Sequence, residues 1–248
     1  MTKWRKINRT WCIWPSRPKE LIEMIGGSYL GISPNISYKR LLEGLSQKDI
    51  AIHAWNYIPG FDHQAQANQA WKDFRECRNK LEIRIGNEFF NPVRIGHSLG
   101  CKLHLISPDR GRKSKSFIGL SFNNFKADSS IPMLGKLKKK ININSEFSPS
   151  PFETMNIISK QYIQPRNLLI RFKDDEIDQT KLLLQHLQIR KRDNSIVIDL
   201  RGNHLTPANS GFKNLLSDIS IENNYKVDEL GSLIDTIYSY ATEKINDT

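Results

Sequence analysis

The stretch Gly96-His97-Ser98-Leu99-Gly100, directly behind the apolar run Pro92-Val93-Arg94-Ile95, decides how this chain folds. It places a serine between two glycines in the pattern of a nucleophile elbow. A serine lifted from the end of a strand onto a helix needs a strained backbone, and the residues two positions away must be tiny to avoid clashes. The residues that follow, 101–106, predict a helix whose N-terminal dipole end faces the serine oxygen. Ser98 is therefore the candidate nucleophile.

Strand-like and helix-like segments alternate along most of the chain. Apolar runs predict strands over 11–14, 21–25, 49–55, 117–122, 167–172 and 195–200. Helical spacing of apolar residues predicts helices over 37–47, from an Asp62 N-cap to Leu81, over 178–190 and over 227–244. This alternation indicates the α/β class, a mostly parallel central sheet flanked by helices. Combined with the elbow, it predicts an α/β-hydrolase fold.

The domain organisation is inferred from the length of the chain and from the alternation of predicted strands and helices. A chain of 248 residues is long enough for one sizeable core, so a single domain spanning 1–248 is expected. Residues 125–165 interrupt the alternation with a lysine run, a Ser-Pro-rich turn and a short helix near Glu153 to Lys160. We expect this segment to be a small cap insertion over the active site.

The composition excludes several classes of protein. A hydrophobic fraction of 38% excludes a disordered chain, and the lack of an 18-residue apolar run excludes a membrane span. The net charge of +11 comes mainly from scattered residues, and the one dense run, 136–140, has no interleaved aromatics. We therefore expect no specific nucleic-acid partner and at most weak peripheral membrane contact.

No secretory signal is visible at the N-terminus, so a cytoplasmic location is expected. Cys12, Cys77 and Cys101 fit neither a disulfide framework nor a zinc pattern and are expected to be reduced thiols.

A serine nucleophile needs a base, and the base needs an acid to orient it. In this fold the three follow the chain order Ser, acid, His. His204 lies in a loop just after a predicted strand, whereas His186 lies among leucines in a helix, so His204 is the expected base. Asp175 stands a few residues beyond the strand that ends at Phe172 and is the expected acid. Asp174 is the alternative acid, and Asp178 is expected to cap a helix.

A tetrahedral intermediate needs N–H donors for its oxyanion. Leu99, directly after the nucleophile, supplies one of them. The other is expected from the glycine loop after the strand at 21–25, where either Gly27 or Ser28 is the donor. No residues stand at metal-ligand spacing around His97 or His104, so neither a metal nor another cofactor is expected.

Longer strings then support a resemblance to a known family. They are Gly26-Gly27 with Gly31, the run 96–104, Ser121-Phe122-Asn123-Asn124, and the stretches 147–151, 166–170, 174–180 and 202–207. Together they resemble domain of unknown function 1350, an α/β-hydrolase superfamily family of cyanobacteria and plant plastids. The resemblance runs from about Trp11 to Pro207. It implies an α/β-hydrolase fold and a photosynthetic source, with no substrate attached.

Two functions fit these observations. The first is a serine hydrolase, an esterase or lipase-like acyl hydrolase that uses Ser98, His204 and Asp175 on a small-molecule or lipid-like ester. A related acyltransferase would pass the same acyl-enzyme to an alcohol. The second is a non-catalytic binding or assembly protein of photosynthetic cells that retains the fold. Nothing in the sequence indicates the oligomeric state.

Overall fold

The fold is that of a computed structural model, which describes residues 3–86, 91–125, 146–208 and 226–243. Its centre is an eight-stranded sheet in the order β1-β2-β4-β3-β5-β6-β7-β8. The strands are β1 (Arg5–Ile7), β2 (Thr10–Ile13), β3 (Glu20–Ile25), β4 (Ile50–Trp55), β5 (Val93–His97), β6 (Ser116–Leu120), β7 (Asn167–Phe172) and β8 (Ile196–Leu200). β2 is antiparallel to both β1 and β4, and all other neighbours are parallel. The expected mostly parallel sheet is confirmed.

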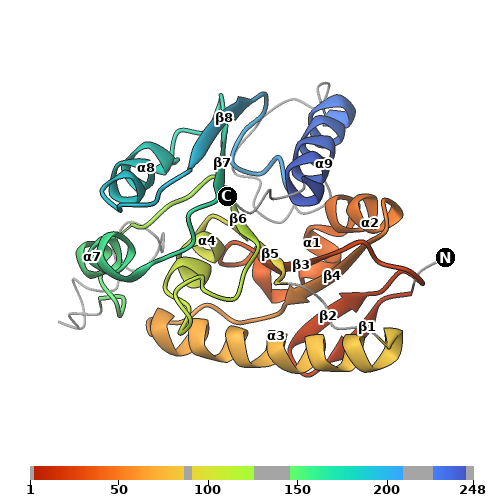
Figure 1. Ribbon diagram of the computed structural model, residues 1–248. Helices are drawn as coiled ribbons and strands as arrows, with labels where there is room; N and C mark the ends of the chain where they lie inside the picture. Colours follow the sequence, from red (N-terminus) through yellow and green to blue (C-terminus); the bar gives the residue numbers. More distant parts are fainter. Residues whose placement is uncertain (1–2, 87–90, 126–145, 209–225, 244–248) are drawn as a thin grey trace, which may run out of the picture.

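Helices cover both faces of this sheet (Figure 1). They are α1 (Pro34–Ser37), α2 (Lys39–Gln47), α3 (His63–Ile85), α4 (Leu99–Leu105), α7 (Pro151–Gln161), α8 (Thr180–Gln188) and α9 (Lys226–Thr242), with a 3₁₀ turn at Leu30–Ile32. One face packs against α1, α2 and α9, and the other against α3, α4, α7 and α8. The central strands are therefore buried on both faces, which explains their continuous apolar runs.

Side-chain alternation assigns the residues of each strand to these two layers. In β4, Ile50, Ile52 and Ala54 face the layer of α2 and α9, whereas Ala51 and Trp55 face that of α3. The strand Ile50–Trp55 is buried along its whole length. The parallel pairs β3–β4, β3–β5 and β5–β6 bring the carboxyl ends of these strands to one edge of the sheet. In this class of fold, ligands bind at that edge.

Most predicted elements agree with the structure, with small local differences. Asp62 does cap α3, because its carboxylate accepts a hydrogen bond from Ala65 N at 2.8 Å. The helix expected over 37–47 is interrupted at Tyr38, where α1 ends and α2 has not begun. Strand β1 was not predicted, since three partly exposed residues carry no clear alternation.

About half of the predicted cap, residues 126–145, lies outside the described ranges. Of the described part, α7 packs with α8 around Met155 and Ile158 in the layer beside the sheet. Phe125 and Phe147, on either side of 126–145, both line the cavity that contains Ser98. A cap over 125–165 stays a prediction. Over the described residues, no helix is both long enough and apolar enough to cross a membrane.

Candidate active site

The elbow forms where β5 meets α4. Ser98 stands between them with φ 54° and ψ −121°, a left-handed backbone conformation that is strained for a serine. A Cβ on Gly96 would press on the backbone of Cys101, and one on Gly100 would press on the carbonyl of Ile25. Both flanking glycines are therefore required by close backbone packing. This geometry matches the one predicted from the pentapeptide.

The base and the acid predicted for Ser98 lie together. His204 Nδ1 is 2.9 Å from Asp175 Oδ2, and the Asp175 side chain is completely buried. Burial alone would raise the pKa of Asp175, but the hydrogen bond and charge of His204 outweigh it, so this pKa lies below its usual value. The other oxygen of Asp175 accepts a hydrogen bond from Ile177 N at 3.0 Å. Asp174 is exposed, so the geometry favours Asp175 of the two candidate acids.

The Ser98 hydroxyl has a partner that was not predicted. Asn123, just beyond β6, donates from Nδ2 to Ser98 Oγ at 2.8 Å. Within the described ranges, this amide and not His204 is the hydrogen-bond partner of the serine side chain. Ser98 and His204 nevertheless line the same cavity of about 250 Å³. Because the Ser98 oxygen only accepts from Asn123, its own O–H remains available to donate to another group.

The two alternative oxyanion donors differ in availability. Gly27 N donates to the Tyr38 hydroxyl at 2.8 Å and is therefore occupied. Ser28 N has no acceptor among the residues that the structure describes, and Ser28 lines the cavity. Leu99 is the first residue of α4, so its N–H has no acceptor within the helix. The geometry leaves Leu99 and Ser28 as the pair of free donors.

A chain of buried hydrogen bonds joins the loop of Gly27 to the loop of His204. His97 Nε2 lies 2.8 Å from the carbonyl oxygen of His204, and a carbonyl only accepts, so Nε2 carries the proton. His97 Nδ1 must then accept from the Tyr38 hydroxyl, 2.7 Å away. That hydroxyl in turn accepts from Gly27 N. Burial lowers the pKa of His97 to about 3, so the ring stays neutral. His97 and Tyr38 thus position both loops around Ser98.

Part of the lining of this cavity is polar and was not predicted. Lys102 and His63 line it, and each is only 1% exposed. Lys102 Nζ donates to the carbonyl of Pro149 at 2.8 Å. Both ring nitrogens of His63 lack a partner among the described residues. Lys102 lies four positions after Ser98 on a helix, a spacing that could have indicated a shared face. The string Ser121-Phe122-Asn123-Asn124 stood out in the sequence, but without a contact to Ser98, and nothing there pointed to His63 or Tyr38.

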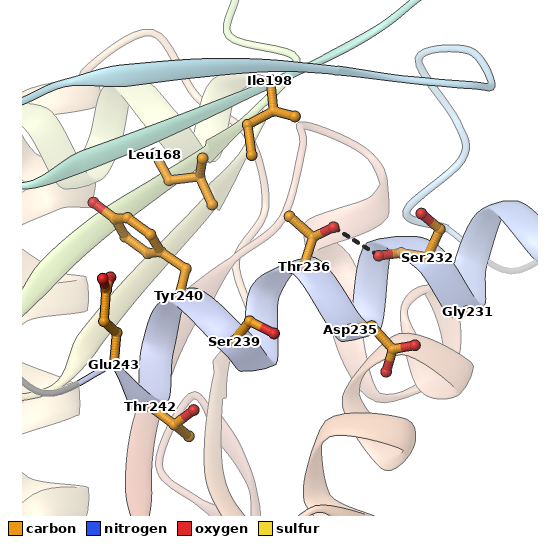
Figure 2. A pocket seen from close by; sticks show the side chains of 10 residues that line it. All are labelled: Leu168, Ile198, Gly231, Ser232, Asp235, Thr236, Ser239, Tyr240, Thr242 and Glu243. Carbon is orange, nitrogen blue, oxygen red and sulfur yellow. Dashed lines mark hydrogen bonds between the residues drawn. The ribbon is translucent and has the colours of Figure 1, made fainter.

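A larger cavity of about 1210 Å³ shares no lining residue with the one around Ser98. Figure 2 shows its wall of α9 side chains facing Leu168 and Ile198 of the sheet. Its carboxylates are already engaged, since Asp235 pairs with Lys48 at 3.0 Å and Glu243 pairs with Arg166. Among the described residues that line it, no serine, threonine or tyrosine is accompanied by a histidine. In the described ranges, no group of three or more His, Cys, Asp or Glu side chains is arranged to hold a metal ion.

Solved structures share this architecture and define the class. Carboxyl esterase 2 of Tuber melanosporum superposes with a TM-score of 0.63 at 14% identity, over 98% of this chain and 87% of its own. The fluorophosphonate-binding serine hydrolase F of Staphylococcus aureus gives 0.59 at 14% identity, with 98% of both chains covered. The monoacylglycerol lipase of Paleococcus ferrophilus gives 0.57 at 13%, over 96% and 99%. The chain has the α/β-hydrolase fold.

Sequence comparison then identifies the family. A family model described as "Protein of unknown function (DUF1350)" matches residues 3–238, nearly the whole chain. The chain therefore belongs to the DUF1350 family, in agreement with the resemblance seen in its motifs. No curated protein matches it in sequence.

Proposed function

We propose that this protein is a serine hydrolase that cleaves a carboxylic ester through Ser98, His204 and Asp175. The observation that carries the proposal is the 2.9 Å contact between His204 Nδ1 and Asp175 Oδ2 in the cavity that Ser98 lines. A nucleophile, a base and an orienting acid make up the machinery of acyl transfer. Esterases and lipases among the structural relatives make an ester the first substrate class to test. A small-molecule or lipid-like ester, a cytoplasmic location and a photosynthetic source stay predictions.

In the proposed mechanism the groups of the site act in sequence. Because Asp175 binds Nδ1 of His204, Nε2 is the nitrogen that takes the proton from Ser98 as its oxygen attacks the carbonyl carbon. The N–H groups of Leu99 and Ser28 stabilise the oxyanion that forms. His204 then protonates the leaving alcohol, and the acyl group stays on Ser98. A water molecule, activated by the same imidazole, releases the acid and restores the serine.

Labelling with a fluorophosphonate probe tests the proposal. The wild-type protein is expected to bind the probe covalently at Ser98, and Ser98→Ala is expected to abolish the signal. Ser239→Ala removes an exposed serine from the larger cavity and is the matched control, expected to label like the wild type. Hydrolysis of short p-nitrophenyl esters should follow the same pattern. Labelling that does not depend on Ser98, or no labelling at all, would instead favour the non-catalytic binding protein.

A further inference from the structure

Two buried polar side chains, those of Lys102 and His63, contribute to the lining of the Ser98 cavity. Lys102 lies in α4, the short helix that begins directly after Ser98, and is 1% exposed, with its ammonium 2.8 Å from the carbonyl of Pro149. An ammonium has three N–H donors, so one carbonyl satisfies only part of it. Burying a cation is costly unless it is paired. Lys102 therefore has unused capacity to bind an anion.

No described carboxylate is paired with Lys102. Glu153 is the carboxylate whose charge acts on Lys102. It accepts a hydrogen bond from Ser150 N at 2.8 Å in a capping box. Because burial dominates, it lowers the pKa of Lys102 from 10.5 to about 7, even though Glu153 acts in the opposite direction. A bound anion would reverse this effect by favouring the charged ammonium.

His63 adds an independent polar group at the same place. It is the first residue of α3, lines the cavity and is 1% exposed. Burial and the positive charge of Lys102 lower the pKa of His63 to about 3, so the ring is neutral and keeps one N–H donor. Neither ring nitrogen has a partner in the described part of the chain. Buried polar groups without partners are rare and call for an explanation such as a ligand.

The aromatic ring of Phe147 holds both groups in place. His63 stacks on it with ring centroids 4.2 Å apart, and Lys102 Nζ lies 5.7 Å from its centroid. Ser98 directly precedes α4, Lys102 is the fourth residue of that helix, and both line the same cavity. A negatively charged group bound here would therefore stand only a short chain away from a carbonyl carbon placed at Ser98.

We propose that Lys102 and His63 bind an anionic group of the substrate, so that the preferred substrate is a short ester carrying a carboxylate or similar anion. The scissile ester is taken from the proposed function, on which this inference rests. The anion accepts hydrogen bonds from Lys102 Nζ and from the ring N–H of His63. A cavity of about 250 Å³ suits a small acidic ester better than a long acyl chain.

Calorimetric binding to the Ser98→Ala variant tests this inference without turnover. Monoethyl glutarate carries the anion on the acyl side, 3-(butanoyloxy)propanoate carries it on the alcohol side, and ethyl pentanoate is the neutral reference. A charge-assisted hydrogen bond predicts that one of the acidic esters binds about 10- to 100-fold more tightly than the neutral one. Which acidic ester binds more tightly identifies the side of the ester bond that faces Lys102. Equal binding of all three would overturn the inference.

Variants separate a ligand-binding role from a structural one. Adding Lys102→Met is expected to remove the preference for acidic esters, whereas Lys181→Met, at an exposed lysine of α8, should keep it. If Lys102→Met does not fold, His63→Phe retains the stacking on Phe147 and should still weaken binding of the acidic ester. A preference that persists in both variants would contradict the assignment. Fluorophosphonate labelling of wild-type Ser98 without any acidic preference would leave the hydrolase standing and refute only this inference. A preference for acidic esters without labelling would refute the hydrolase and leave only the binding of an anion by Lys102 and His63.

Discussion

Asp174 and Asp175 are adjacent in sequence but differ completely in their surroundings. The side chain of Asp175 is fully buried against His204, whereas that of Asp174 is exposed to solvent. Only the buried carboxylate is placed to hold the imidazole in one tautomer and, in the proposed mechanism, to stabilise its positive charge. The lowered pKa of Asp175 keeps it ionised near neutral pH. The chemical difference between these neighbours is therefore set by one hydrogen bond.

Asp175→Asn and Asp174→Asn form a matched pair at this scale. The first variant is expected to lower kcat for an ester substrate by about 10²- to 10⁴-fold, because the imidazole loses its orienting charge. The second should remain within about 2-fold of the wild type, as expected for an exposed residue. Steady-state hydrolysis of a p-nitrophenyl ester measures both. Equal losses in the two variants would contradict the assignment of Asp175.

At the scale of elements, the elbow depends on how closely α4 approaches β3. Gly100 lies against the carbonyl of Ile25, at the end of β3, with no space for a side chain. The approach brings the N-terminus of α4 beside the loop that contains Gly27 and Ser28. Glycine is therefore needed here for packing between elements, in addition to the strained turn at Ser98.

Gly100→Ala is expected to destabilise the protein by about 3 kcal/mol, because the added methyl group has to displace backbone. Gly231→Ala is the control, since a Cβ there meets nothing within 4 Å and the residue lies in α9. Alanine in a helix is favoured over glycine, so the control should gain roughly 0.5–1 kcal/mol. Urea denaturation followed by circular dichroism compares the two. A neutral Gly100→Ala would show that the elbow can relax.

At the scale of the whole molecule, a buried charge cluster ties the sheet to its covering layer. Arg94 of β5 makes a two-pronged contact with Asp109, both distances being 2.9 Å. Glu23 of β3 lies 3.7 Å from Arg94 and 2.8 Å from Arg78 of α3. Arg94, Asp109 and Glu23 are each less than 9% exposed. Although burial acts in the opposite direction, Arg94 holds the pKa of Asp109 well below its usual value.

Asp109→Asn is expected to cost about 3 kcal/mol of stability at pH 7, because it removes half of a buried ion pair. The sign of the pH dependence follows from the lowered pKa of Asp109. Its stabilising contribution is complete above the unfolded pKa of about 3.9 and is lost as the pH falls toward the folded value. The gap between the unfolding free energies of wild type and variant should therefore stay constant above about pH 4 and narrow as the pH falls below that value. A gap that does not change with pH would contradict a charge-based role.

Local patterns of residues were enough to predict several parts of this protein. Apolar periodicity predicted the central strands and the flanking helices, and glycine spacing predicted the elbow at Ser98. Chain order after the elbow predicted His204 and narrowed the acid to two neighbouring carboxylates. The fold prediction is confirmed because side-chain direction along a strand or helix follows directly from residue number. The catalytic roles of Ser98, His204 and Asp175 stay predictions.

Tertiary structure alone decided which distant side chains meet. In the folded chain Asp175, and not Asp174, contacts His204. The Gly27 N–H donates to the Tyr38 hydroxyl, and the Ser98 hydroxyl accepts a hydrogen bond from Asn123. Folding also brings His63 from the start of α3 to the cavity that Lys102 lines. Such contacts join residues far apart in the chain, so they depend on how whole elements pack and not on any local repeat. The charge of Lys102 was visible in the sequence, but its burial beside Ser98 followed only from the packing of α4.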